Sequence, residues 1–380
     1  MKNTLLKTIL ATLVISTSAS SAFAADRVMV ARGTQHTLAV RADGQLYGWG
    51  YDGDGQLGNG PGGSSYVGTA IAVPGMTSSI SAAAGSNFSL VLDIAGEVWS
   101  FGGNNRGQLG DGSTTASDVP IPVSGLDHVV SIAAGHSHAI ALTEGGQVYA
   151  WGRGDYGQIG DGAGVDRLSP TLVPGLSDIV AIAAGSDHNM ALRADGKVFT
   201  WGSSGYGQIG DGTWSNRLSP VMISLSNIRG VSAGGQHSLA LTSDGKVYAF
   251  GANYSGQLGD GTYTTHVSPV LLTTLTNVAS VSAAQFSSIV VLADGSAMVF
   301  GSNTGGQLCI GNNTGTPTPT AVVTGGARIS SSAPGGASNN AMLMYADGTL
   351  HGCGANWSGQ LGNGTYNAGY NTPVSVTAVW

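Results

Sequence analysis

The stretch AGSDHNMALRADGKVFTWG, residues 184–202, contains two apolar runs joined by Asp195-Gly196. A two-residue Asp-Gly turn needs positive φ at both positions, so between apolar runs it is a strong β-hairpin signal. In the preceding copy of this stretch, the run 139–142 reads AIAL and is apolar at every position. Continuous rather than alternating apolarity indicates a strand that is covered on both faces.

The pattern returns along the whole chain. Each copy is followed by a motif such as GQIGDG (207–212), and the glutamines of these motifs lie 49 to 53 residues apart: Gln56, Gln108, Gln158, Gln208, Gln257, Gln307 and Gln360. A period near 50 residues over 25–380 predicts a repeat architecture. Glycine, at 62 of 380 residues, supplies the turns that so many short strands require.

Each repeat provides about four strands. A run of small residues such as SIAAG (131–135) suits a crowded innermost strand, and the hairpin supplies two more. A proline then begins an outer strand, as in SPTLV (169–173), where an edge can lack full pairing. Seven such units predict an all-β, seven-bladed β-propeller of antiparallel strands in one domain over 25–380. An open β-solenoid is the alternative, although its coils usually have shorter periods.

The consensus A-G-x-x-H-x-x-A-L…D-G-x-V-Y-x-W-G…G-Q-L-G-D-G resembles the regulator of chromosome condensation repeat. The resemblance covers the chain after residue 24 and implies the seven-bladed propeller of that family. The repeat histidine appears as His36, His138, His188 and His237, and we place Phe88, Ser288 and Asn340 at its position elsewhere. The sixth repeat also departs from the pattern in its motif, GQLCIG (306–311).

The resemblance also bears on function. The family's founding nuclear member looks like a nucleotide-exchange factor for a small GTPase that also binds chromatin, through an inserted wedge and a basic tail. The repeat spacing here leaves no room for a sizeable insertion, and the tail is not basic. No exchange residue can therefore be transferred to this chain, and an exchange-factor-like effector is kept only as an alternative.

The first 24 residues differ from the repeats. Lys2 and Lys7 precede or flank an apolar stretch, 9–15, and the segment ends in Ala22-Phe23-Ala24. This order predicts a secretory signal peptide cleaved near Ala24, so we expect a secreted or periplasmic protein of bacterial type. The apolar run is too short to span ~30 Å of hydrocarbon, and no membrane insertion is expected.

Charge and motifs limit the classes of ligand. The formal net charge is −7 and only 9% of residues are charged. Nucleic-acid binding needs many neutralised phosphates, so we expect no nucleic-acid partner. The sequence has no phosphate-binding P-loop or dinucleotide fingerprint, so we expect no cofactor. We also expect the protein to be a monomer.

Two features of the sequence raise the question of a bound metal ion and of a disulfide bond. Asp52 and Asp54 in WGYDGDGQLGNG (49–60) look like a calcium loop, but they do not recur, and calcium takes about six to eight oxygen ligands. We therefore interpret this stretch as a turn and expect no metal site. An oxidising compartment allows a disulfide between Cys309 and Cys353, although two small buried apolar side chains would also fit.

The sequence offers no catalytic group. The four repeat histidines should lie on a ring of equivalent sites and hydrogen-bond neighbouring backbone. Large or charged residues that vary from blade to blade in otherwise polar loops are better candidates, because binding surfaces use aromatic residues and arginine in this way. The candidate binding residues are Arg106, Asp155, Tyr156, Tyr206, Trp214, Tyr254, Tyr263 and Trp357.

The leading hypothesis is a secreted, non-catalytic propeller that binds a protein, or alternatively a glycan, through variable loops. An extracellular hydrolase or lyase with carboxylates at the propeller mouth is the second hypothesis. Two converging carboxylates could come from different blades, which the sequence alone does not reveal.

Overall fold

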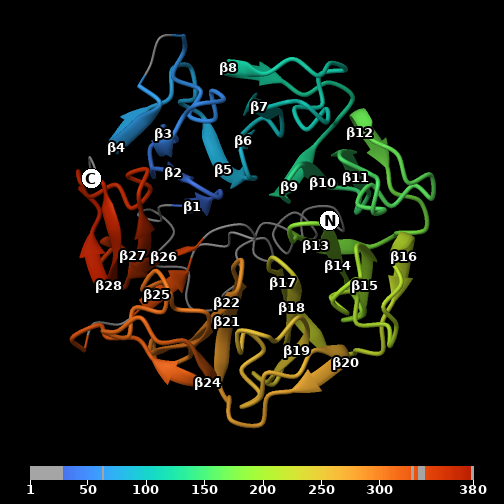
Figure 1. Ribbon diagram of the computed structural model, residues 1–380. Helices are drawn as coiled ribbons and strands as arrows, with labels where there is room; N and C mark the ends of the chain where they lie inside the picture. The colour runs from blue at the N-terminus through green and yellow to red at the C-terminus, as the bar shows by residue number, and fades with distance from the viewer. Residues whose placement is uncertain (1–28, 62–63, 327–328, 333–338, 378–380) are drawn as a thin grey trace, which may run out of the picture.

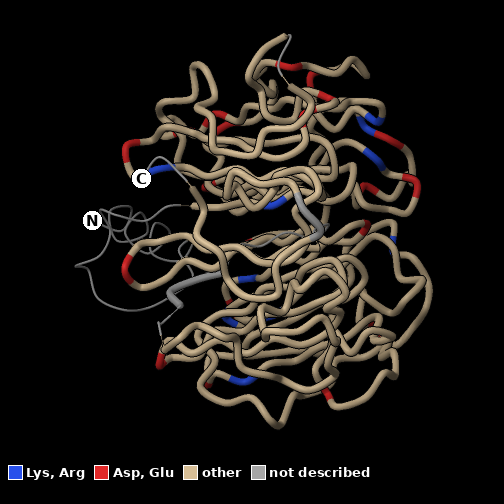
Figure 2. The backbone as a smooth tube through the Cα atoms, turned by 60° about the vertical axis from the view of Figure 1, so that its left-hand side comes forward, with Lys and Arg blue, Asp and Glu red and all other residues tan. Residues whose placement is uncertain are grey.

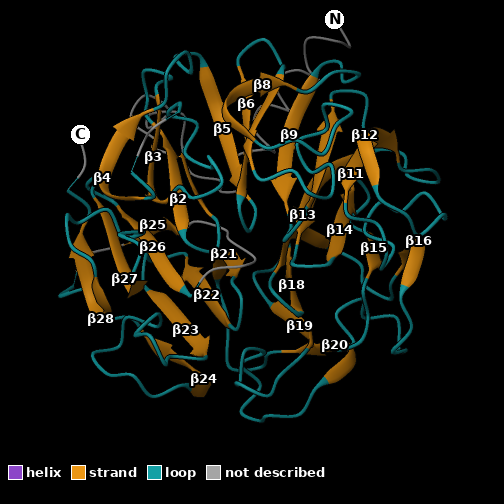
Figure 3. Ribbon diagram, turned by 45° about the horizontal axis from the view of Figure 1, so that its top comes forward, coloured by secondary structure: helices purple, strands orange, loops and turns teal. Residues whose placement is uncertain are grey.

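The computed structural model describes residues 29–61, 64–326, 329–332 and 339–377. It consists of seven four-stranded antiparallel sheets arranged as the blades of a ring (Figure 1). Strands and loops make up the whole described chain, as Figure 3 shows. The all-β, seven-bladed propeller predicted from the repeat period is therefore confirmed. The predicted signal peptide, 1–24, lies outside the described residues.

Each blade is one continuous segment whose four strands pair in chain order. Blades 1 to 3 contain β1 (Met29–Arg32), β2 (His36–Val40), β3 (Leu46–Tyr51), β4 (Tyr66–Ala72); β5 (Ser79–Ala84), β6 (Phe88–Asp93), β7 (Val98–Gly102), β8 (Ser117–Pro122); β9 (Val129–Ala134), β10 (His138–Thr143), β11 (Val148–Gly152) and β12 (Arg167–Leu172). Blades 4 and 5 contain β13 (Ile179–Ala184), β14 (His188–Arg193), β15 (Val198–Gly202), β16 (Arg217–Met222); β17 (Ile228–Ala233), β18 (His237–Thr242), β19 (Val247–Gly251) and β20 (His266–Leu271). Blades 6 and 7 contain β21 (Val278–Ala283), β22 (Ser287–Leu292), β23 (Ala297–Gly301), β24 (Thr316–Ala321); β25 (Ile329–Ser332), β26 (Asn340–Tyr345), β27 (Leu350–Asn356) and β28 (Asn367–Ser375).

The first strand of each blade is innermost, and successive first strands such as β9, β13 and β17 contact one another around the centre (Figure 1). Small residues there allow this close approach. The second strands are covered on both faces, and all six residues of β10 are buried. Both features agree with the sequence prediction.

The outer strand begins earlier than predicted. Pro170 lies inside β12 and not at its start, because β12 already pairs through Arg167 with Gly152. The register shifts between this pair and the Ala150–Thr171 pair, so Pro170 falls in an irregular segment of an edge strand. A residue without an N–H is tolerated there, since no neighbouring strand lies beyond the edge.

The ring closes between blades 7 and 1 without sharing a strand. The Trp49 indole Nε1–H and the Thr37 hydroxyl both donate to the Gln360 carbonyl, each at 2.9 Å. An apolar cluster that includes Ala39, Met342 and Leu361 fills the same seam. Closure therefore depends on hydrogen bonds and side-chain packing between the two blades rather than on a sheet that contains strands of both.

Charged residues are spread over many loops, as Figure 2 shows. Among the described residues, no helix is long and apolar enough to cross a membrane.

Candidate binding face

The antiparallel order places two sets of loops at one end of the ring. Turns between first and second strands, and loops between third and fourth strands, lie on the same face of every blade. We call this end the loop face. All eight candidate binding residues lie in third-to-fourth-strand loops, so they belong to the loop face.

The repeated glutamine builds these loops. The Gln158 side-chain Oε1 accepts the Tyr156 backbone N–H at 2.9 Å, which fixes the loop just before the G-Q dipeptide. The same bond is made in all seven blades, by Gln56, Gln108, Gln158, Gln208, Gln257, Gln307 and Gln360. The buried glutamine is thus part of the scaffold, and the residues before it are presented at the loop tips.

A second recurrent bond joins neighbouring blades. The backbone N–H of the last glycine in each motif donates to a carbonyl of the next blade's outer strand, at 2.8 or 2.9 Å. The seven pairs are Gly60–Asp118, Gly112–Leu168, Gly162–Leu218, Gly212–Val267, Gly261–Pro317, Gly311–Asn371 and Gly364–Gly68. The sixth motif keeps this bond although Ile310 replaces its aspartate.

The repeat histidines connect blades through side chains. His188 Nε2 lies 2.9 Å from Ser238 Oγ of the next blade, and that hydroxyl donates to the Gln208 carbonyl at 2.9 Å. Because the hydroxyl proton is used, the imidazole must be the donor to Ser238. The other three repeat histidines make equivalent hydrogen bonds, in the pairs His36–Ser89, His138–Asn189 and His237–Ser288.

Two sequence expectations about these histidines were wrong. Their partners are side chains of the following blade rather than neighbouring backbone, because inter-blade packing brings the next second strand against the ring nitrogen. In blade 6, Ser287 takes the histidine position, since it pairs with Gly301 as His237 pairs with Gly251. Ser288, the residue chosen from the sequence, instead accepts from His237 at 2.8 Å.

Three aromatic rings form one continuous cluster on the loop face. The ring centroids of Tyr206 and Tyr254 are 6.1 Å apart, and those of Tyr254 and Phe286 are 5.8 Å apart, with tilts of 60° and 55°. The rings belong to blades 4, 5 and 6. Tyr206 and Tyr254 are 43% and 49% exposed, so the cluster, which we call the aromatic cluster, faces solvent.

The tyrosine at the centre of this cluster is held in place and uncharged. The Tyr254 hydroxyl donates to Gln236 Oε1. Partial burial, and to a smaller extent Tyr206, raises the pKa of Tyr254 to about 12. Phe286 was missed from sequence, although it is the one aromatic residue directly before the histidine position in any repeat.

The candidates in blades 2 and 3 form charged contacts instead. Arg153 lies 2.7 Å from Asp155 and 3.4 Å from Asp187, and its guanidinium carbon is 4.6 Å from the Tyr156 ring centroid. Arg106 of blade 2 pairs with Asp166 of blade 3 at 3.0 Å. These exposed pairs add little stability, but they make this part of the loop face polar.

The remaining candidates do not join the aromatic cluster. Trp214, Tyr263 and Trp357 are 56%, 58% and 66% exposed, and the described structure gives them no ring-to-ring contact. Trp214 and Tyr263 lie on the approach to outer strands β16 and β20, whereas Trp357 follows β27 in blade 7. The eight candidates are therefore on one face but not in one site.

The sequence matches known protein families. Residues 15–240, more than half of the chain, match the RCC1-like domain. The chain belongs to the RCC1-like domain family. Residues 228–257 and 244–291 also match regulator of chromosome condensation (RCC1) repeats. None of the curated proteins matches the chain.

Three solved structures have the same fold. Human WBSCR16 is 28% identical with a TM-score of 0.73, covering 82% of this chain and 85% of its own. Yeast RCC1 (Prp20), solved bound to Kap60, is 23% identical with a TM-score of 0.81, covering 97% and 87%. Prp20p from Saccharomyces cerevisiae, reported with its binding properties to Gsp1p and histones, is 24% identical with a TM-score of 0.78. The match covers 95% of this chain and 90% of that protein.

The calcium-like stretch of this RCC1-like propeller has a structural role. Asp52 Oδ1 accepts the Leu57 backbone N–H at 2.8 Å. Asparagines make the same bond in four other blades: Asn104, Asn253, Asn303 and Asn356. Asp52, Asp54 and Asp118 do line one hollow, but it lies beside outer strand β8 rather than at the ring's mouth. The described residues contain no group of three side chains placed to hold a metal ion.

Replacing Asp52 with Asn is expected to stabilise the protein by about 1 kcal/mol at pH 7. Burial raises the pKa of Asp52, so its ionised form carries a desolvation cost. An asparagine would keep the bond to Leu57, and once the Asn59 amide, which now donates to Asp52, has turned over, it would supply an N–H to Asn59 Oδ1, which is buried without a partner. Asn356 and Asn363 already form such a pair at 3.0 Å.

Urea unfolding at pH 7 measures this effect, with and without calcium. Asp54→Asn is the matched control, since Asp54 is exposed, and it should change stability by less than about 0.5 kcal/mol. Loss of stability in Asp52→Asn, together with calcium stabilisation of the unaltered protein alone, would instead identify a calcium site.

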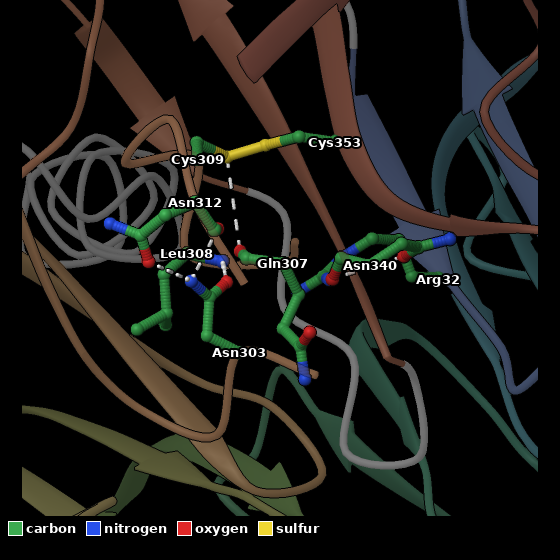
Figure 4. The surroundings of a disulfide bond; sticks show 8 residues. All are labelled: Arg32, Asn303, Gln307, Leu308, Cys309, Asn312, Asn340 and Cys353. Carbon is green, nitrogen blue, oxygen red and sulfur yellow. Dashed lines mark hydrogen bonds between the residues drawn. A yellow bond between two sulfur atoms is a disulfide. The ribbon is translucent and has the colours of Figure 1, made fainter. Parts of the chain in front are cut away.

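The two cysteines are joined in the structure. Cys309 and Cys353 form a disulfide with a Cα–Cα distance of 5.8 Å, and both are fully buried between blades 6 and 7 (Figure 4).

Proposed function

We propose that this RCC1-like propeller is an exported, non-catalytic protein that binds a partner protein through the loop face, with the aromatic cluster at the centre of contact. The supporting observation is the arrangement of Tyr206, Tyr254 and Phe286. They come from three blades, Tyr254 contacts both of the other rings, and the two tyrosines are exposed while Phe286 is half-buried. Aromatic side chains grouped in this way dominate binding energy at protein interfaces.

The surroundings of the cluster favour a partner that offers an uncharged contact surface. The turns and loop tips beside it carry Gln236, Ser255 and Gln285, and the charged contacts of Arg153 lie in the neighbouring part of the face. Tyrosine combines a large apolar ring with a hydroxyl, so it suits a surface that meets both apolar and hydrogen-bonding groups. The fixed Tyr254 loses little rotamer freedom on binding.

Relatives give limited support for a protein partner. Yeast RCC1 was solved bound to another protein, Kap60, which fits a binding role for a propeller of this fold. Identity below 25% transfers the fold and not the partner. Nucleotide-exchange activity therefore stays an alternative, and a nucleotide-release assay with a small GTPase tests it directly.

The double variant Tyr206→Ala/Tyr254→Ala is expected to weaken partner binding at least about tenfold, because central aromatic residues each contribute about 1 to 2 kcal/mol or more. The partner is first cross-linked and isolated from the exported fraction, and its affinity is then measured by surface binding to purified protein. Trp214→Ala is the matched control, since it removes an equally exposed ring outside the cluster.

Assays on the same purified protein and variants distinguish between the competing functions. Equal loss of affinity in Trp214→Ala and in the double variant would contradict a central role for the cluster. Binding to a glycan array that the double variant abolishes would identify a glycan ligand instead of a protein. Turnover of a polysaccharide by the purified protein would favour the hydrolase. Export itself predicts a mature chain beginning at Ala25, which mass spectrometry of the exported protein checks.

A further inference from the structure

Six of the seven seams between blades contain the same contact. The second glycine of a GQxG motif faces the aromatic ring that ends the third strand of the next blade: Gly58–Phe101, Gly110–Trp151, Gly160–Trp201, Gly210–Phe250, Gly259–Phe300 and Gly362–Trp49. At Gly160 an added Cβ would lie 2.9 Å from the Trp201 ring, so the ring covers the glycine directly. We call this the glycine–aromatic contact.

The seam between blades 6 and 7 has cysteine at both of these positions. Cys309 replaces the glycine and keeps its left-handed backbone, with φ of 59°. Cys353 replaces the aromatic residue, since it pairs with Ala341 as Trp201 pairs with Asn189. The disulfide therefore stands where the other six seams have the glycine–aromatic contact (Figure 4).

Other recurrent contacts are missing at the same seam. Ser287 replaces the histidine, and Ala341 replaces the residue that in four other seams receives the imidazole. In the other seams a serine, threonine, asparagine or tryptophan side chain donates to the motif glutamine's carbonyl. Neither Ala341 nor a bridged Cys353 has an O–H or N–H to donate to Gln307.

Among the described residues of this seam, two kinds of contact stand beside the disulfide. The Gly311 N–H donates to the Asn371 carbonyl at 2.8 Å, as its equivalents do elsewhere. An apolar cluster including Leu308, Leu343 and both cysteines fills the interior of the seam. In the described part of the chain, the bridge takes the place of the specific side-chain contacts that join the cores of blades at the other seams.

We propose that the Cys309–Cys353 disulfide is a redox-dependent replacement for the glycine–aromatic contact, so that reduction loosens this seam alone. A dithiol reductant supplies two electrons and two protons, the S–S bond breaks, and two buried thiols remain while the reductant becomes a disulfide. The reduced seam then has neither the covalent link nor the ring packing of its six counterparts. This inference is independent of the proposed binding function.

The test compares three proteins with and without dithiothreitol. Reduction of the unaltered protein should lower its Tm by about 4 °C, from the loss of a cross-link across 44 residues. It should also speed amide hydrogen exchange in β23 and β27 at least about tenfold, while β15 in blade 4 stays unchanged. Cys309→Ser/Cys353→Ser should behave like the reduced protein under both conditions.

The decisive variant restores the contact of the other seams. Cys309→Gly/Cys353→Trp should keep the slow exchange of the oxidised protein and be insensitive to dithiothreitol, with the new indole donating to Gln307. If this pair does not fold, Cys309→Gly/Ala341→Ser/Cys353→Phe copies the seam between blades 4 and 5, with its Ser238 and Phe250. Unchanged exchange on reduction of the unaltered protein, or free thiols in the exported protein by mass spectrometry, would overturn the proposal.

Discussion

Between about pH 6.5 and pH 4 the folded ring is expected to lose stability steeply, at about 4 kcal/mol per pH unit from three buried histidines, with a further contribution from a fourth. The cause is the set of four repeat histidines, His36, His138, His188 and His237, all fully buried. Burial lowers the pKa of His36, His188 and His237 to about 3, and it lowers the pKa of His138 as well. For a domain stable by about 10 kcal/mol, acid unfolding is expected near pH 4.

The geometry explains why these imidazoles resist protonation. Each Nε2–H already donates to a serine or asparagine of the next blade. Each Nδ1 is buried and has no hydrogen-bond partner. A second proton would have to be placed on Nδ1, which would create a buried N–H without an acceptor and a buried charge that only at His138 is partly offset by a carboxylate, Asp187.

The sign of the effect follows from proton uptake. Below about pH 6.5 the unfolded chain holds a proton on each of these histidines, while in the folded chain His36, His188 and His237 stay neutral until about pH 3. Unfolding in this window therefore takes up protons, and stability falls as the pH falls, by about 1.4 kcal/mol per pH unit for each histidine. Carboxylates affect stability at lower pH than these histidines do. Asp195 is an example, because its side-chain hydrogen bond with Arg193 lowers its pKa to about 2.

A variant copied from the chain itself isolates one histidine. The seam between blades 2 and 3 has Phe88 at the histidine position, Ala139 at the receiving position, and the Trp151 indole donating to the Gln108 carbonyl. His138→Phe/Asn189→Ala gives the next seam the same set, because the Trp201 indole already donates to the Gln158 carbonyl at 3.0 Å.

Urea unfolding at several pH values between 7 and 5 gives the slope. The double variant should reduce this slope, by at most about one quarter because it removes one histidine of four, and Asn105→Ala at an exposed loop tip should leave the slope unchanged. Equal stability at pH 7 and pH 5 in the unaltered protein would show that the imidazoles gain protons in the folded state.

The architecture could be predicted from sequence because it depends on local signals repeated seven times. Asp-Gly turns such as Asp195-Gly196 fix hairpins within one blade, and a constant period leaves a ring as the simplest closure. Single-residue alignment was less secure where a repeat has degenerated. Ser287 and Ser288 are adjacent identical residues, and only strand pairing shows which one takes the histidine position.

Contacts between blades were harder to predict. The partners of His188 and Tyr254 lie about 30 to 50 residues away, and side-chain direction decides whether they meet. The aromatic cluster depends on Phe286, which lies in a first-to-second-strand turn. All candidate binding residues predicted from the sequence lie in third-to-fourth-strand loops instead. The paired change to cysteine could have been found, since Cys309 and Cys353 replace the glycine and the aromatic residue of two successive repeats.

Substitution of Gly185 by Ala is expected to destabilise the protein by at least about 3 kcal/mol, the upper range for overpacking, because two neighbours already occupy the space. A Cβ at this position would lie 2.3 Å from His188 Cε1 and 2.4 Å from the Gly234 carbonyl oxygen of the next blade. Its φ lies outside the left-handed region, so the constraint is the closeness of these atoms and not backbone conformation.

Blade 6 supports this interpretation, since it has Ala284 at the equivalent position together with Ser287 in place of the histidine. Gly185→Ala/His188→Ser should therefore recover part of the lost stability, whereas the contact with the Gly234 carbonyl prevents full recovery. Gly205→Ala is the matched control in the same blade, because a Cβ there would meet nothing within 4 Å. Thermal and urea unfolding of the three variants measure the effect, and equal stability of Gly185→Ala and Gly205→Ala would mean that neighbouring blades separate easily enough to admit a methyl group.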